Sequence, residues 1–180
     1  MKGLTGTVVL EPADGSLGPL LRVTDDRLAA GVGYGRHAHR AVDVVAVVLS
    51  GSLRHRWVDG DVLLHAGDVG ILCAGAGLEH DEVAGDDGAR VLQCHLRGAR
   101  PADPAAYEVV RRPSGWVELG RPDARLWLGS PADPAPEGLR LGVTADGVLV
   151  DDAASAQAVV VREVVWELDR SRPAWAGDRG

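Results

Sequence analysis

The chain has 180 residues, of which 46% are hydrophobic and 25% are charged, and its formal net charge is -7 at pH 7. This composition is that of a globular protein and excludes a disordered chain. The arginines are scattered among acidic residues, which argues against a nucleic-acid-binding face. No apolar window is long enough to span a bilayer or to form the core of a signal peptide. We therefore expect a cytoplasmic protein that contacts neither nucleic acid nor membrane directly.

Short apolar runs separated by turn residues predict an all-β protein. The expected strands cover residues 4–10, 20–23, 44–49, 53–58, 62–64, 69–73, 90–96, 107–111, 124–128, 139–143, 148–150 and 158–168. Asp59-Gly60 and Asp146-Gly147 are hairpin signals. Turn signals recur about every 8–12 residues, which is typical of β-sandwiches and barrels.

Acidic and sulfur side chains in this pattern have simple interpretations. The adjacent aspartates form three pairs: Asp25-Asp26, Asp86-Asp87 and Asp151-Asp152. We expect each pair to cap a turn on a solvated surface, because Asp favours turns. The two cysteines, Cys73 and Cys94, are too few for a disulfide framework, and their apolar neighbours predict buried free thiols.

The segment from Gly98 to Ala106 contains two prolines and predicts a linker. We therefore expect two domains. Residues 1–100 would form an N-terminal metal-binding barrel, and residues 101–180 would form a smaller C-terminal β domain without metal ligands. All six histidines lie between residues 37 and 95, so metal chemistry belongs to the first half.

Two pairs of metal-capable side chains carry the functional signal. His37 and His39 form one pair, and His80 and Glu82 form the other. Side chains at positions i and i+2 of a strand point to the same face, so each strand can present two ligands together. If the two strands face each other, four ligands converge. A lone His-x-His arises often by chance, whereas two such pairs in a β context favour a site for divalent Fe, Mn, Ni, Co, Cu or Zn.

Four further polar residues are candidates for a cavity wall or for a shell of hydrogen bonds around the ligands: Asp43, His55, Gln93 and His95. His55 alternates with Leu53 and Trp57, which favours a core or cavity-lining histidine over a ligand. Gln93 and His95 share one strand face, so they either line the cavity or are ordinary satisfied polar residues. Asp43 follows His39 by four residues, and we expect it to accept hydrogen bonds rather than to bind metal.

Three segments resemble the pirin family of the cupin superfamily. Residues 37–43 read HAHRAVD against the family's HxHRxxE, with Asp43 in place of the usual Glu. Residues 49–56 read LSGSLRHR against LxGxLxHR, and residues 67–82 carry the family's GDVxxxxAGxGxxHxE without a gap. The resemblance extends from about residue 18 to residue 112. Residues 57–60 read WVDG and depart from the family's Asp-Ser-x-Gly.

The resemblance implies a bicupin, that is, two β-barrels in one chain, with a shortened second barrel here and metal only in the first. It gives the ligand role to the same four residues that the spacing selects: His37, His39, His80 and Glu82. The cofactor implied is one divalent transition metal, with iron as the first choice and Mn, Ni, Co, Cu or Zn as alternatives.

Family members include metal-dependent dioxygenases that open the flavonol quercetin and iron-binding nuclear cofactors. The first activity implies a small-molecule substrate, with Glu82 as the catalytic general base. The alternative is a non-enzymatic metal-binding protein that senses redox state or binds a protein partner. A third interpretation is a barrel that keeps the fold but has lost its metal.

Overall fold

The computed structural model describes residues 3–150 and 158–171 of the chain. Within them it consists of strands and loops without a helix, so the prediction of an all-β protein is confirmed. This described part therefore contains no helix that is long and apolar enough to cross a membrane. The predicted turn at Asp151-Asp152 lies outside the described residues.

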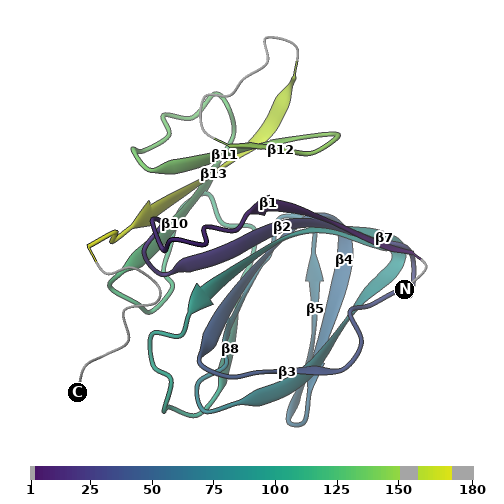
Figure 1. Ribbon diagram of the computed structural model, residues 1–180. Helices are drawn as coiled ribbons and strands as arrows, with labels where there is room; N and C mark the ends of the chain where they lie inside the picture. Colours follow the sequence, from purple (N-terminus) through teal and green to yellow (C-terminus); the bar gives the residue numbers. More distant parts are fainter. Residues whose placement is uncertain (1–2, 151–157, 172–180) are drawn as a thin grey trace. The chain divides into compact units, whose positions relative to one another are not determined.

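Thirteen strands follow one another along the described chain (Figure 1). Their bounds are β1 Leu4–Leu10, β2 Leu20–Leu28, β3 His37–His39, β4 Val42–Trp57, β5 Gly60–His65, β6 Val69–Cys73, β7 Leu78–Arg97, β8 Ala106–Val110, β9 Gly115–Val117, β10 Ala124–Gly129, β11 Leu139–Thr144, β12 Val148–Val150 and β13 Val160–Leu168. Most predicted strands are present, while the sequence pattern does not predict the short strand β9.

Eight strands form the first sheet, in the order β1-β2-β7-β4-β6-β8, with β3 beside β7 and β5 beside β4. The long strands β4 and β7 are antiparallel, and their register runs from Val42 opposite Arg97 to Trp57 opposite His80. Residues 43–48 of β4 are all buried, as expected for a β-branched apolar run that is covered on both faces. Strand β7 of this pair carries the candidate ligands His80 and Glu82.

Strands β4 and β7 are each longer than the sequence predicts. The pattern predicts separate strands at residues 44–49 and 53–58 and a turn at Asp86-Asp87, but both stretches belong to continuous strands. The register between β4 and β7 shifts on both sides of Gly51, which has a φ of 69°. A bulge bends a strand without ending its ladder, so the glycine that suggests a chain reversal marks a bend instead.

The prediction that Asp25 and Asp26 cap an exposed turn is wrong. Both are buried and lie within β2, which continues to Leu28 rather than ending at residue 23. Asp25 accepts two hydrogen bonds of 2.8 Å from the guanidinium of Arg90. Asp26 accepts hydrogen bonds from the hydroxyls of Thr24 and Tyr34, at 3.0 and 2.9 Å. These hydrogen bonds, those from Arg90 being distant in the chain, compensate for the burial of the two carboxylates.

Both predicted hairpins are present. Trp57 lies opposite Gly60 in the β4–β5 hairpin, so Val58 and Asp59 form its two-residue turn. The second hairpin joins β11 to β12, where the backbone N–H of Thr144 donates to the carbonyl of Gly147.

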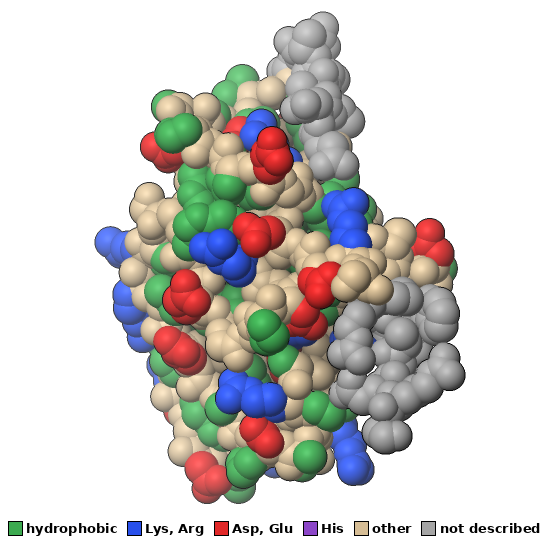
Figure 2. Space-filling model, turned by 90° about the vertical axis from the view of Figure 1, so that its left-hand side faces the viewer, with side chains coloured by type: hydrophobic (Ala, Val, Ile, Leu, Met, Phe, Trp, Pro, Cys, Tyr) green, Lys and Arg blue, Asp and Glu red, His purple; other side chains and the backbone are tan. Residues whose placement is uncertain are grey.

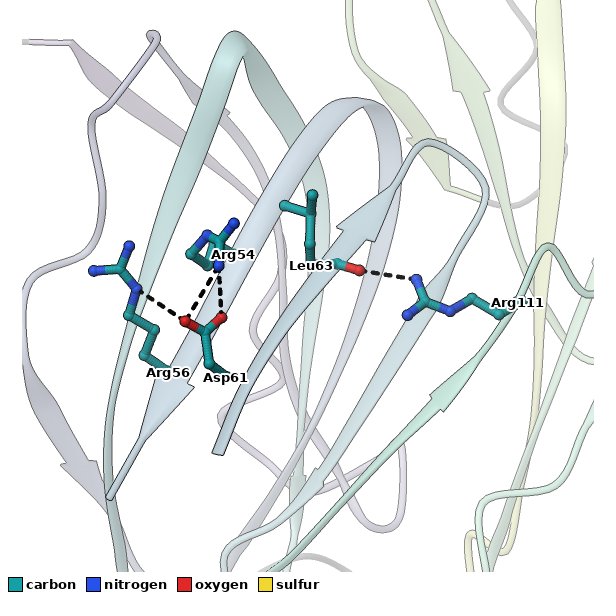
Figure 3. Close-up of polar contacts among 5 residues, drawn as sticks. All are labelled: Arg54, Arg56, Asp61, Leu63 and Arg111. Carbon is teal, nitrogen blue, oxygen red and sulfur yellow. Dashed lines mark hydrogen bonds and ion pairs between the residues drawn. The ribbon is translucent and has the colours of Figure 1, made fainter. Parts of the chain in front are cut away.

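The outer face of the β4–β5 hairpin is charged (Figure 3). Arg54 and Arg56 both approach the carboxylate of Asp61, at 2.9 and 3.7 Å. These pairs are solvent-exposed and contribute little stability. Side chains alternate along a strand, so His55, which lies between the outward-facing Arg54 and Arg56, points inward. It is 1% exposed.

Five strands form the second sheet, in the order β12-β11-β13-β10-β9. Its core contains the buried side chains of Leu126, Leu141, Val164 and Trp166. The chain divides into two compact units, one made of Met1–Leu10 with Arg22–Arg112 and the other of Glu11–Leu21 with Pro113–Gly180. The predicted linker before residue 106 leads directly into β8, which pairs with β6 of the first sheet. The predicted domain boundary at residue 100 stays a prediction.

Charged side chains of both signs are mixed on one face of the protein. On the face drawn in Figure 2, Lys and Arg side chains lie among Asp and Glu side chains. This face therefore presents no extended area of one charge to which a polyanion could bind.

Candidate metal centre

Strands β3 and β7 bring three histidines together. They are antiparallel, with His37 opposite His80 and His39 opposite Leu78 (Figure 1). The loop before β3 is also held against β7, because the backbone N–H of Tyr34 donates to the carbonyl of Glu82 at 3.0 Å. The short strand β3 is therefore fixed along β7, and its two imidazoles lie beside that of His80.

The three imidazoles turn their ring nitrogens toward one another. Nε2 of His37 lies 3.1 Å from Nε2 of His39 and 3.0 Å from Nε2 of His80. One ligand atom from each of the three histidines lies within 4.8 Å of the others. The strand spacing of the two pairs predicts this convergence for the histidines.

These separations suit neighbouring ligands of one metal ion. Two nitrogens about 2.1 Å from a metal are about 3.0 Å apart when the angle at the metal is 90°, and about 3.4 Å apart in a tetrahedral arrangement. Both separations that involve His37 match the right angle. The two separations that involve His37 therefore fit neighbouring ligands of one divalent metal.

The tautomer of His37 also suits a ligand. Its Nδ1 lies 2.8 Å from the carbonyl oxygen of Gly35. A carbonyl can only accept, so Nδ1 carries the proton and Nε2 of the neutral ring presents a lone pair to the cluster. Metal-binding histidines generally hold their second nitrogen in this way.

Burial favours the neutral form of two of the three imidazoles, those of His80 and His39. Burial, together with the charges of His55 and His37, lowers the pKa of His80 to about 3. Burial likewise lowers the pKa of His39, with His37 as the second cause. Neutral rings have the free nitrogen lone pairs that a metal needs.

Glu82 lies on the same face of β7 as His80 but is not one of the three clustered residues. Its Oε2 accepts a hydrogen bond of 3.0 Å from Nε2 of Gln93. Burial raises the pKa of Glu82 to about 7, while the hydrogen bond from Gln93 opposes that rise. The ligand role of Glu82 stays a prediction.

His55 lies immediately behind the cluster. It is opposite Glu82 in the β4–β7 register, and its Nε2 makes a short hydrogen bond with Nδ1 of His80. Its ring also packs against the rings of Tyr107 and Trp57, with centroid distances of 4.2 and 5.3 Å. His55 therefore contacts the candidate ligand His80 at Nδ1, which is the ring nitrogen of His80 that does not face the cluster.

The other two candidates are His95 and Asp43, which have different surroundings. The ring of His95 is 5.8 Å from that of His39, and its Nδ1 is buried without a hydrogen-bond partner among the described residues. Asp43 is buried and accepts a hydrogen bond of 3.2 Å from the backbone N–H of Ala99. That it does not bind metal stays a prediction.

The sequence analysis did not identify Asp26, Tyr34 and Tyr107 as neighbours of Glu82. Burial, followed by the charges of Asp26 and Glu82, raises the pKa of Tyr34. Burial also raises the pKa of Tyr107, and the charge of Glu82 adds to that effect. No residue spacing indicated these neighbours, because they lie on β2, on β8 and in the loop before β3.

A family model described as Pirin matches the first half of the chain. The match runs from residue 10 to residue 96. A quercetin 2,3-dioxygenase from Escherichia coli strain K12 is 34% identical over 61 residues, which are 33% of this chain and 26% of that protein. The chain thus matches only about a quarter of the length of that relative.

Solved structures extend the likeness to both sheets. The bacterial pirin YhhW from Escherichia coli, solved in complex with nickel(II), has a TM-score of 0.69 at 18% identity, and the match covers 93% of each chain. A quercetin 2,3-dioxygenase from Acinetobacter baumannii has a TM-score of 0.55 at 17% identity, covering 92% of this chain and 79% of that one. The predicted pirin-like bicupin fold, with a smaller second part, is confirmed.

Proposed function

We propose that the first unit binds one divalent transition metal through His37, His39 and His80, with Glu82 as the fourth ligand. The observation that carries this proposal is the convergence of three imidazole nitrogens at separations of 3.0 and 3.1 Å. The lowered pKa values of His80 and His39 and the contact between Nδ1 of His37 and the carbonyl of Gly35 support it. The complex of YhhW with nickel(II) also supports a divalent metal of the first transition row.

The activity that we propose is a dioxygenase reaction that opens the ring of a flavonol such as quercetin, with O2 as co-substrate. The names of the relatives from Escherichia coli and Acinetobacter baumannii support this choice. When bound, the metal supplies a Lewis acid that favours the anionic form of the substrate's enol oxygen.

Glu82 is the residue that we propose as general base. Gln93 donates a hydrogen bond to Oε2 of Glu82. In this role Glu82 would loosen from the metal, and its other oxygen, Oε1, would accept the proton of the substrate hydroxyl. The buried position of the carboxyl group excludes bulk water from this proton transfer. The histidines hold their positions throughout, since β3 and β7 fix their backbones.

The experiment is anaerobic loading of the protein with Fe, Mn, Ni, Co or Cu, followed by quercetin and then O2. We expect loss of the flavonol absorption band with at least one metal, and no loss with His37→Ala. Glu82→Gln should keep part of the metal binding but lose turnover. If no metal supports a spectral change, the dioxygenase proposal fails.

Tight metal binding without turnover would favour the second proposal, a metal-binding protein that acts through redox state or a protein partner. Either role requires a bound metal, and the three-histidine cluster could hold one in both cases. Metal analysis of the purified protein alongside the quercetin assay separates the two proposals.

A further inference from the structure

His55 is a buried histidine that the proposed reaction does not use. It is 1% exposed, and its Nε2 contacts Nδ1 of His80. The outward-facing Arg54 and Arg56 of the same strand pair with Asp61, which keeps the His55 side of β4 turned inward. The contact with His80 is therefore built into the strand framework.

We propose that His55 is a positioning residue that accepts a hydrogen bond from Nδ1–H of His80 and thereby aims Nε2 of His80 at the metal. This inference rests on the proposed metal site. Two of the three clustered histidines differ in what holds their outer nitrogen: Nδ1 of His37 contacts the carbonyl of Gly35, whereas Nδ1 of His80 contacts another imidazole.

The direction of this hydrogen bond follows from the chemistry of imidazole. A neutral ring has one N–H and one lone pair. If Nε2 of His80 gives its lone pair to the metal, Nδ1 of His80 must carry the proton. Nε2 of His55 must then be the acceptor, so the proton of His55 is on its own Nδ1. One contact thus fixes the tautomers of both rings.

The surroundings of His55 allow this tautomer. Its Nδ1 is buried without a hydrogen-bond partner among the described residues. The ring of Tyr107 meets that of His55 in an edge-to-face contact, with an interplanar angle of 70°. No hydrogen-bond donor among the described residues therefore requires the lone pair of Nδ1, so the proton of His55 can occupy this nitrogen.

The test compares the Zn²⁺ affinity of three variants with that of the wild type, measured by titration calorimetry against a competing chelator. His55→Leu removes the acceptor, and we expect affinity to fall by about 10- to 100-fold. His55→Gln places an amide oxygen close to the position of Nε2 and should recover most of the loss. Tyr107→Phe is the matched control, because it keeps the ring beside His55 and removes a hydroxyl without a hydrogen-bond partner among the described residues.

A spectroscopic readout tests the same inference without any variant. In the Zn²⁺-loaded wild type, ¹⁵N–¹H correlation spectra should show the proton on Nδ1 of both His80 and His55. This measurement keeps the proposal falsifiable if His55→Leu fails to fold.

The outcomes separate this inference from the proposed function. If the wild type binds Zn²⁺ and His55→Leu binds it equally well, or if His55 carries its proton on Nε2 in the loaded protein, the positioning role is wrong while the metal site stands. If the wild type and Tyr107→Phe both fail to bind Zn²⁺, Fe²⁺ or Ni²⁺, the metal site itself is wrong, and the positioning role is wrong with it.

Discussion

At the scale of single residues, the chemistry depends on which ring atom faces the site. Strand alternation predicts that His37 and His39 share a face, and that His80 and Glu82 do as well. It does not predict that Gly35 fixes the tautomer of His37 or that Gln93 holds Glu82, because these contacts depend on loop geometry and on a bend in β7. The ligand pairs could therefore be predicted from sequence, but the hydrogen bonds around them could not.

Removing one clustered imidazole should weaken metal binding. We predict that His39→Ala lowers Zn²⁺ affinity by at least about 100-fold, since the loss of a ligand costs more than the loss of an outer hydrogen-bond partner. His65→Ala is the matched control, because His65 is exposed and is not part of the cluster. Calorimetric titration measures both. Equal losses in the two variants would contradict a site built on His39.

At the scale of elements, the site depends on two long strands that bend without breaking. The sequence predicts the apolar runs and both hairpins correctly but divides β4 into two strands, because a glycine in a bulge resembles a glycine in a turn. The partner strand decides between these alternatives: the ladder from β4 to β7 continues on both sides of Gly51. This continuity places His55 beside His80.

A side chain at the Gly51 bulge should destabilise the first sheet. A Cβ there would lie 2.1 Å from the carbonyl oxygen of Gly88, and the φ of 69° is unfavourable for alanine. We predict that Gly51→Ala lowers the free energy of unfolding by about 3 kcal/mol in urea denaturation. Gly31→Ala is the control: its φ is 68°, but its Cβ would meet no atom within 4 Å, so only about 1 kcal/mol is expected. Equal costs would show that the bulge contact is unimportant.

The turn between β5 and β6 is fixed by a buried carboxylate. Asp68 accepts hydrogen bonds from the backbone N–H of His65 and from the guanidinium of Arg111, at 2.9 and 2.7 Å. Arg111 also donates to the carbonyl of Leu63, which ties the strand β5 to the end of β8 (Figure 3). Burial alone would raise the pKa of Asp68, but these hydrogen bonds and the charge of Arg111 lower it below its ordinary value.

The lowered pKa has a definite effect on stability. Because the folded-state pKa of Asp68 is below the unfolded value of about 3.9, its contribution is complete above that pH and is lost as pH falls through the folded pKa. We predict that Asp68→Asn lowers the free energy of unfolding by about 2 kcal/mol at pH 7. The difference from the wild type should stay constant between about pH 5 and 8 and shrink below about pH 4. A difference that grows on acidification would contradict this role.

At the scale of the whole molecule, composition predicts an all-β chain with metal chemistry in its first half only. The second sheet lacks histidine because all six lie between residues 37 and 95. The sequence could not predict that Glu11–Leu21 belongs to the same compact unit as Pro113–Gly180, since this pairing depends on contacts that are distant in the chain.

Metal should stabilise the folded chain, because it binds the native site and not the unfolded chain. At a free metal concentration of 100 times Kd, the free energy of unfolding should rise by about 2.7 kcal/mol. Thermal unfolding with Zn²⁺ and with a chelator measures this shift in the wild type and in His37→Ala. A shift of equal size in the variant would mean that the metal binds elsewhere.

The most direct test of the metal site is a crystal structure of the protein grown with Ni²⁺, with diffraction data collected at the absorption edge of the metal. We predict one anomalous peak in the first unit, about 2.1 Å from Nε2 of His37, His39 and His80. Full metal occupancy elsewhere on the chain, with no peak among these three nitrogens, would contradict the proposed site.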